Sequence, residues 1–343
     1  GQRLFGSRYE RATDTWTPAE SMESGTGDAE DPQVAVAQNG NAVLVWRLTS
    51  EEQYVNDRIM GRYFDTQSAT PGWSAPEVLD DSWLDMVSPA VDIDDDGHAV
   101  AVWGRGIGVS EIHAKRCDSQ GVWGERERID YSAEETTLGV YDLQVQVTGD
   151  GNAVALWNEP GEDPVDNSYI RRLFANDFQA GTGQWGDATA LPLTTGQIAD
   201  PVLGVDQDGN ALAVWVTSVE GVLENLVSSR FDVVEREWSQ ETVVTPALSG
   251  GPELAVDPAG DAVLLWVYES HIHALHYDGA AGLWGDPVPI EDGLGRVDQP
   301  NVSVDDDGNA VAVWLQRGHD SGGSGDTYSV YALRYHAQEG TWR

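Results

Sequence analysis

The stretch Val302–Trp314, VSVDDDGNAVAVW, sets the architecture because close copies of it recur along the whole chain. In it, an Asp-Gly turn separates two runs of small and β-branched residues, which is the sequence signal of a β-hairpin. Earlier copies end at Trp46, Trp103, Trp157, Trp215 and Trp266. A hairpin repeated every ~50 residues indicates blade-like units stacked around an axis or along a line.

Each hairpin is followed by a second half with its own tryptophan. In "IMGRYFD…GW", for example, an outer strand is followed by a turn and Trp73. The other tryptophans of this series are Trp16, Trp123, Trp185, Trp238, Trp284 and Trp342, so that only Trp83 lies outside both series. We name the four strands of a repeat A to D. Strand C carries a recurring arginine (Arg8, Arg62, Arg116, Arg230, Arg334), for which we expect a structural salt bridge to a turn aspartate.

These patterns predict an all-β protein, a six-bladed β-propeller of four-stranded antiparallel blades, with residues 1–343 as a single domain. The A–B hairpins are expected near residues 32–47, 89–104, 142–157, 200–215, 252–266 and 300–314. A C–D half without an A–B hairpin opens the chain, and we expect residues 1–22 to close the ring. The alternative is a seven-bladed propeller with one blade shared or incomplete.

The composition is strongly acidic, with 58 Asp and Glu against 19 Lys and Arg and a formal net charge of −39. Such a surface repels phosphate backbones, so no nucleic-acid partner is expected. No apolar run approaches the ~18 residues of a membrane span, so no membrane insertion is expected. The single cysteine, Cys117, excludes an intrachain disulfide. We expect a secreted, halophilic monomer in an extracellular, periplasmic or cell-surface location.

The chain resembles the secreted bacterial β-propellers whose blades carry an Asp-Gly turn and a trailing tryptophan. It is loosely similar to the Asp-box (BNR) repeats of sialidases and related glycan-binding propellers. An Asp-box has aspartate two residues before its glycine, and here only Asp95 and Asp306 hold that place. The resemblance therefore implies the architecture and no catalytic residue.

The turn carboxylates raise the question of calcium. Asp92–Gly97, DIDDDG, copies the start of an EF-hand loop, but the twelfth position, where that loop needs a bidentate Glu, is Trp103. The acids are also missing from the copy around Gly40. We therefore interpret the phrase as a hairpin turn, in which glycine supplies the positive φ.

Candidate ligand-binding residues lie where the repeats differ. Strand A usually starts with proline, and the residue before it is expected to approach the axis. Asp31, Asp142 and Asp200 hold that place, and three converging carboxylates would bind calcium, the candidate cofactor, or sugar hydroxyls. The alternative is that they cap strand ends.

Two further features are candidates. His271 and His273 share one face of a strand and together would chelate a metal, although a solvated outer strand is the simpler interpretation. Trp83, in the D–A loop DDSWLDMVSP, is a candidate platform for a sugar ring, with a packing role as the alternative.

No credible catalytic set is evident, so we expect a non-catalytic binding or adhesion propeller that recognises carbohydrate or another protein. The first alternative is a polysaccharide-degrading hydrolase or lyase. A lyase acting on uronates needs a local arginine or histidine pocket, which this composition makes improbable. The second alternative is a structural spacer of a larger surface protein.

Overall fold

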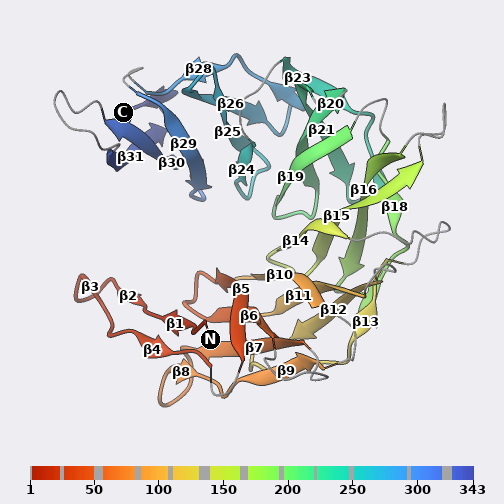
Figure 1. The fold of residues 1–343 in the computed structure, drawn as a ribbon, viewed down its shortest axis with the longest axis vertical. Coiled ribbons are helices and arrows are strands. Elements are labelled where there is room, and N and C mark those ends of the chain that lie inside the picture. Colours follow the sequence, from red (N-terminus) through yellow and green to blue (C-terminus); the bar gives the residue numbers. More distant parts are fainter. Residues whose placement is uncertain are drawn as a thin grey trace. The chain divides into compact units, whose positions relative to one another are not determined.

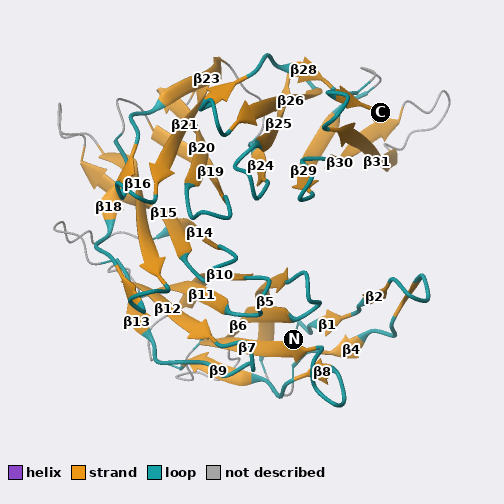
Figure 2. Cartoon of the chain, turned by 180° about the vertical axis from the view of Figure 1, so that it is seen from behind, coloured by secondary structure: helices purple, strands orange, loops and turns teal. Residues whose placement is uncertain are grey.

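The structure is a computed structural model that describes residues 2–23, 27–49, 57–81, 86–106, 111–130, 140–162, 169–192, 197–219, 222–246, 251–291, 295–318 and 327–343. Every regular element in these ranges is a β-strand (Figures 1 and 2). Within the same ranges, no helix is long and apolar enough to cross a membrane.

The chain divides into two compact units, which are described separately. The first comprises Gly1–Pro160 with Ala175–Thr189, and the second comprises Gly161–Phe174 with Ala190–Arg343. Whether they form the single domain expected from the repeats stays a prediction.

Three antiparallel sheets begin in the first half of the chain, each a path of consecutive strands. The first sheet contains β5 (Asp28–Val36), β6 (Ala42–Thr49), β7 (Arg58–Asp65) and β8 (Gly72–Trp73), with β9 (Glu77–Asp80) also on β7. The second contains β10 (Met86–Ile93), β11 (Ala99–Arg105), β12 (Glu111–Cys117) and β13 (Glu127–Arg128). The third contains β14 (Tyr141–Val147), β15 (Ala153–Glu162), β16 (Tyr169–Gln179) and β17 (Gln184–Trp185), with β18 (Thr189–Ala190) on β16.

Three sheets of the same kind follow. The fourth contains β19 (Gln197–Val205), β20 (Ala211–Val219), β21 (Val222–Asp232) and β22 (Glu237–Trp238), with β23 (Thr242–Pro246) on β21. The fifth contains β24 (Glu253–Val256), β25 (Ala262–Tyr268), β26 (His271–Asp278) and β27 (Leu283–Trp284), with β28 (Val288–Pro289) on β26. The sixth contains β29 (Val297–Val304), β30 (Ala310–Gly318), β31 (Thr327–His336) and β32 (Thr341–Trp342).

The turn between strands A and B explains the repeated acids. In the second sheet, the Gly97 N–H donates to the Asp94 carbonyl at 3.0 Å, and Gly97 has a φ of 94°. The Asp94 carboxylate accepts the backbone N–H of His98 at 2.7 Å. Equivalent carboxylate-to-backbone bonds are made by Asp206, Asp257 and Asp305. The carboxylate three residues before glycine thus holds the hairpin turn, as Asx-type capping does elsewhere.

A bulge interrupts strand A at the residue that precedes the proline, or at Asp142 in the third sheet, where leucine replaces the proline. Asp31, Asp142 and Asp200 have φ values of 50°, 51° and 48°, and Ser88 and Gln299 share this left-handed conformation. The pairing of strands A and B shifts by one residue at each of these positions. The residues that we predicted to line the axis are therefore the bulge residues of their sheets.

Within each unit, side chains of consecutive sheets share apolar clusters. In the first unit, Val43 and Val45 of β6 pack in one cluster with Ala99 and Ala101 of β11. The tryptophans that end the B strands are buried against these layers; they are Trp46, Trp103, Trp157, Trp215, Trp266 and Trp314. The B strands are buried on both faces over most of their length, as β6 and β11 are, because each sheet has neighbours on both sides of its strand B.

The recurring strand-C arginines do not share one partner: Arg8 and Arg116 stack on the next repeat, Arg62 lies over Trp73 of its own sheet, and Arg334 contacts a turn aspartate. The guanidinium of Arg8 lies 4.7 Å from the ring centroid of Phe64, and that of Arg116 lies 4.3 Å from that of Phe178. The expected ion pair with a turn aspartate is found at Arg334 and Asp305, at 3.9 Å. Cation–π packing is thus one of the roles of this arginine, because the planar guanidinium stacks on aromatic faces.

The N-terminal residues form strands of their own. β1 (Phe5–Gly6) pairs with β4 (Glu20–Ser21), and β2 (Tyr9–Glu10) pairs with β3 (Thr15–Trp16). This segment packs on the first sheet through Met22 and Leu4, which share a cluster with Leu44 and Trp46. Its predicted ring-closing role stays a prediction.

Candidate functional site

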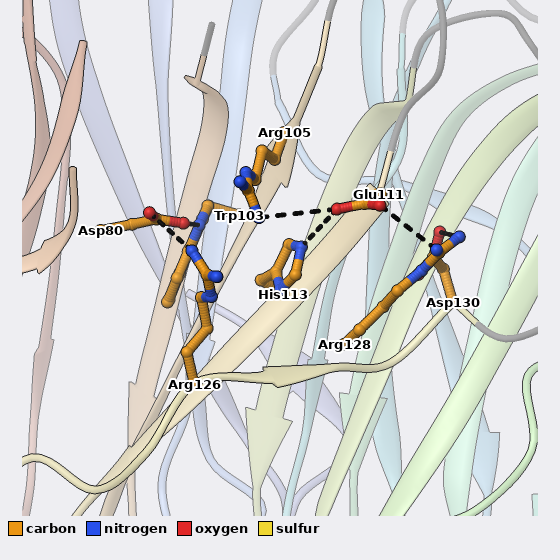
Figure 3. A network of polar contacts seen from close by, with 8 residues as sticks. All are labelled: Asp80, Trp103, Arg105, Glu111, His113, Arg126, Arg128 and Asp130. Atoms are coloured by element: carbon orange, nitrogen blue, oxygen red, sulfur yellow. Dashed lines mark hydrogen bonds and ion pairs between the residues drawn. The ribbon is translucent and has the colours of Figure 1, made fainter. Parts of the chain in front are cut away.

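A network of charged side chains lies at one end of the second sheet (Figure 3). We call it the second-sheet network; it consists of Asp80, Trp103, Arg105, Glu111, His113, Arg126, Arg128 and Asp130. Strand pairing builds it, since β11 places Arg105 opposite Glu111 and β12 places His113 opposite Arg128. Three arginines are thereby gathered at the strand ends that border the B–C and D–A loops.

Asp80 anchors one side of the network. Its carboxylate accepts the indole N–H of Trp103 at 2.9 Å through Oδ2 and an Arg126 N–H at 2.8 Å through Oδ1. The side chain of Asp80 is 1% exposed, whereas that of Arg126 is 35% exposed. Because Asp80 ends strand β9 of the first sheet, this contact ties the first two sheets together.

Glu111 is the centre of the other side. Its Oε2 accepts from His113 Nε2 at 2.9 Å and lies 3.6 Å from Nη1 of Arg105. Its Oε1 accepts from Arg128 Nη1 at 3.3 Å. Arg128 also donates through Nε to the Asp130 carboxylate at 2.7 Å. One carboxylate thus holds a histidine and two arginines from three adjacent strands.

Contacts within the network, together with burial, shift the pKa values of Glu111 and His113. The hydrogen bond from His113 and the charges of Arg128 and Arg105 hold the pKa of Glu111 below its usual range, against the effect of burial. Burial lowers the pKa of His113, and the nearby arginines act in the same direction. At neutral pH the pair is therefore an ionised Glu111 with a neutral His113, which donates from Nε2.

One donor and one acceptor of the network, Arg105 Nε and His113 Nδ1, are unused within the described residues. Both atoms are buried. Three arginines face three carboxylates, Asp80, Glu111 and Asp130, so the formal charge is balanced. A guanidinium carries five N–H donors in a planar fork that matches a carboxylate. The arrangement is suited to holding an anionic or polyhydroxylated group.

Two of the three predicted carboxylates, Asp31 and Asp142, are held by neighbours in their own sheets. Oδ2 of Asp31 lies 3.2 Å from Nε of Arg47, and Asp142 accepts from Asn158 Nδ2 at 2.5 Å. Asp200 lies beside Gly251, the residue in the equivalent place of the fifth repeat; a Cβ on Gly251 would lie 3.2 Å from that of Asp200. Asp31 and Asp142 belong to the first unit and Asp200 to the second, so their convergence stays a prediction.

The two predicted histidine ligands are neighbours with other partners. The ring centroids of His271 and His273 are 6.4 Å apart, with the planes at 82°. His271 Nδ1 bonds Glu291 at 2.5 Å, and His273 stacks on Trp266 at 5.5 Å. Among the described residues, no group of three or more His, Cys, Asp or Glu is arranged to hold a metal ion.

Trp83 lies outside the described residues, so its role as a sugar platform stays a prediction. It follows Asp80 by three positions in the chain, which links the predicted platform to the network by sequence. Sequence reasoning missed the network itself. The available signals were the Glu-x-His pair at Glu111 and His113, which share one face of β12, and the Arg-x-Arg pair at Arg126 and Arg128.

No known protein family and no curated protein matches this chain by sequence. Solved structures do match. The polysaccharide lyase Uly1 matches with a TM-score of 0.54 and 10% identity, over 97% of this chain and 85% of that one. The GH93 α-L-arabinofuranosidase of Fusarium graminearum matches with a TM-score of 0.53 and 11% identity, over 89% and 93%. The NanB sialidase of Streptococcus pneumoniae matches with a TM-score of 0.53 and 8% identity, over 92% and 69%.

The chain has a β-propeller fold. Identities this low establish the fold alone. The predicted all-β propeller class is confirmed, as is the likeness of its architecture to sialidase propellers. The number of blades and the Asp-box assignment stay predictions.

Proposed function

We propose that this chain is a non-catalytic carbohydrate-binding propeller that recognises acidic sugars through the second-sheet network. The proposal is supported by the activities of its structural neighbours, a sialidase, an arabinofuranosidase and a polysaccharide lyase, which all act on sugars. Together with the composition, these neighbours favour an extracellular, periplasmic or cell-surface location.

The observation that carries the proposal is the gathering of Arg105, Arg126 and Arg128 in a chain with a net charge of −39. In so acidic a protein, a sugar carboxylate is repelled from most of the surface. Arg126 is the arginine best placed to receive it, because its side chain is one third exposed and donates one hydrogen bond to Asp80. The fork of the guanidinium supplies further donors in carboxylate geometry.

A binding role is favoured over hydrolysis by the environment of the carboxylates. Burial raises the pKa of Asp92 to about 6, but this side chain accepts the Val147 backbone N–H at 2.7 Å. Burial also raises the pKa of Asp257, which holds its own hairpin turn through the Asp261 N–H at 3.0 Å. Both carboxyls have structural roles. Hydrolysis instead needs a carboxyl with a raised pKa that faces a second carboxyl across the substrate.

The alternative supported by a specific observation is a lyase acting on uronates. The second-sheet network supplies the arginines and the histidine that such chemistry requires, which the composition alone made improbable. His113 is neutral, but its side chain is 6% exposed and bonded to Glu111. Its free nitrogen, Nδ1, is the one that would accept a proton, and it is buried, so a proton-abstracting role would need this atom to become accessible.

The experiment is a polysaccharide array probed with the labelled chain, comparing uronate-containing, sialylated and neutral polymers, with calcium and with chelator. We expect saturable binding to acidic polymers that falls about tenfold or more in Arg126→Gln, the cost of one lost charge-assisted contact of ~1.4 kcal/mol. The matched control is Arg58→Gln, an exposed arginine on β7 outside the network. Thermal unfolding of each variant verifies the fold.

The outcomes separate the candidates. Blank arrays in both conditions, or equal binding by Arg126→Gln and wild type, would overturn the proposal. Loss of binding with chelator would assign calcium to the site and direct attention to Asp31, Asp142 and Asp200. An increase in ultraviolet absorbance during incubation with polyuronates, from the unsaturated product, would replace the binding role with the lyase alternative.

A further inference from the structure

A cleft of ≈ 440 Å³ lies between the fifth and the sixth sheet. Both sheets belong to the second unit, and their side chains share one apolar cluster. The cleft is lined by the A–B turns and by strands C and D; its lining includes Asp257, Asp261, His276, Trp284, Asp307 and Tyr335. Among the described residues, the whole lining contains four aspartates and no lysine or arginine. A cleft of this size holds a small molecule.

The other A–B turns show how the buried turn carboxylate is normally satisfied. In the fourth sheet, Asn210 Nδ2 donates to Asp206 Oδ2 at 2.8 Å. Equivalent contacts with Oδ2 occur in the second and sixth sheets, between His98 and Asp94 and between Asn309 and Asp305. In each pair, the partner of the aspartate is the residue directly after the turn glycine.

The fifth sheet has a second carboxylate in place of this donor, because the residue after Gly260 is Asp261. Asp257 is 4% exposed, and its Oδ1 accepts the N–H groups of Ala259 and Asp261. Within the described residues, no side chain donates to this carboxylate. Its Oδ2 lies towards the sixth sheet, 3.2 Å from the place of a Cβ on Gly308. A buried carboxylate is costly without such a partner, so this turn lacks a donor that the other turns contain.

Strand C of the fifth sheet also lacks a positive charge at this place. Strand pairing puts His276 where the second sheet has Arg116. The guanidinium of Arg116 lies 4.3 Å from the ring centroid of Phe178 in the next sheet. The ring of His276 packs against Tyr335 of the next sheet, with centroids 4.0 Å apart. Burial lowers the pKa of His276, so its imidazole is neutral at neutral pH, and Nε2 is buried without a hydrogen-bond partner among the described residues.

We propose that the cleft between the fifth and sixth sheets binds a small molecule that carries a guanidinium group. The guanidinium donates to the carboxylates of Asp257 and Asp261, as Asn210 donates to Asp206. It lies among the aromatic side chains of the cleft, as the guanidinium of Arg116 lies on an aromatic ring. Its planar fork of N–H donors matches carboxylate oxygens, and its charge offsets that of the acids. This inference does not depend on the proposed carbohydrate site.

The requirement for N–H donors makes the test specific. The full chain is titrated with methylguanidinium and, separately, with tetramethylammonium, which has the same charge but no N–H donor, and binding is followed by ligand-observed NMR. Sodium chloride at about 0.3 M screens the attraction of any cation to the acidic surface. We expect saturable binding of methylguanidinium alone. Equal binding of the two cations, or no saturable binding of methylguanidinium, would overturn the proposal.

Asp261→Asn gives this turn the amide donor of the fourth and sixth sheets. We expect methylguanidinium to bind this variant about tenfold or more weakly than wild type, because one carboxylate is lost and the amide donates to the other. The matched control is Asp96→Asn, the same change at an exposed turn aspartate of the second sheet, which should bind like wild type. Equal binding by Asp261→Asn and wild type would contradict the site.

A second variant covers the event that Asp261→Asn does not fold. His276→Arg supplies the cleft with a guanidinium of the chain itself, at the place where the second sheet has Arg116. We expect this variant to bind methylguanidinium several-fold more weakly than wild type, because its own side chain occupies the cleft. Unchanged binding in His276→Arg would show that the cation binds elsewhere and would overturn the proposal.

Discussion

Nε2 of His113 lies 2.9 Å from Oε2 of Glu111, two residues earlier on the same strand. Arg105 on β11 and Arg128 on β13 reach the same carboxylate from either side. Ion pairs to both neighbouring strands thus hold the N-terminal end of strand β12. Losing one member of a buried polar network lowers the stability of the fold. A prediction about stability therefore follows from this pair, in addition to the functional one.

Acidification should destabilise the protein through His113. Its pKa is lowered by burial, so the unfolded chain binds the proton more readily, and stability is lost as pH falls below about 6.5. Each unit of pKa difference is worth about 1.4 kcal/mol. The free energy of unfolding in urea, measured from pH 7.5 to 5.5, should decrease less steeply in His113→Gln. His98→Gln, at a half-exposed side chain, is the control. Parallel curves for His113→Gln and wild type would contradict the assignment.

Removing the Trp103 indole N–H should cost more than removing its counterpart in another sheet. Trp103 donates to Asp80, whereas the buried Nε1 of Trp215 has no hydrogen-bond partner within the described residues. Both side chains are fully buried, so the packing loss in Trp103→Phe and Trp215→Phe is comparable. We expect Trp103→Phe to be less stable by an additional ~1–3 kcal/mol, the cost of a hydrogen bond to a buried carboxylate. Equal unfolding free energies of the two variants would refute this.

Neutralising Asp92 should stabilise the protein at neutral pH. Burial raises the pKa of Asp92 to about 6, so its ionisation above that pH opposes folding. In Asp92→Asn the side-chain carbonyl still accepts the Val147 N–H, without the charge. We expect a gain on the order of 1 kcal/mol at pH 7.5 that shrinks towards pH 5, because the wild-type carboxyl is protonated there. A gain that does not vary with pH would rule out the charge as its cause.

Two glycines of a single turn should respond in opposite ways to alanine. Gly151 has a φ of 79°, whereas Gly149 is not in the positive-φ region, and a Cβ added to it would meet no heavy atom of the described residues within 4 Å. Gly151→Ala should cost about 1–2 kcal/mol, because an L-residue is disfavoured in that conformation. Gly149→Ala should be neutral or stabilising by up to ~1 kcal/mol, since it restricts the unfolded chain. Thermal unfolding of both variants provides the measurement, and similar destabilisation would contradict it.

The repeat and its hairpins could be predicted from the amino-acid sequence alone. Asp-Gly between short apolar runs specifies a tight turn with local hydrogen bonds, and Asp94 and Gly97 make those bonds within four residues. Asp31 was singled out because it precedes a proline, but the bulge there was not predicted, because its left-handed φ depends on pairing with β6. Local interactions of this kind are encoded locally, so pattern alone finds them.

The candidate site, by contrast, could be found only in the folded chain. Asp80, Glu111 and Arg128 lie on three strands from two repeats. Their spacing in the sequence does not indicate that they belong to one network. Their contacts depend on the register between neighbouring strands and on how the first sheet packs on the second.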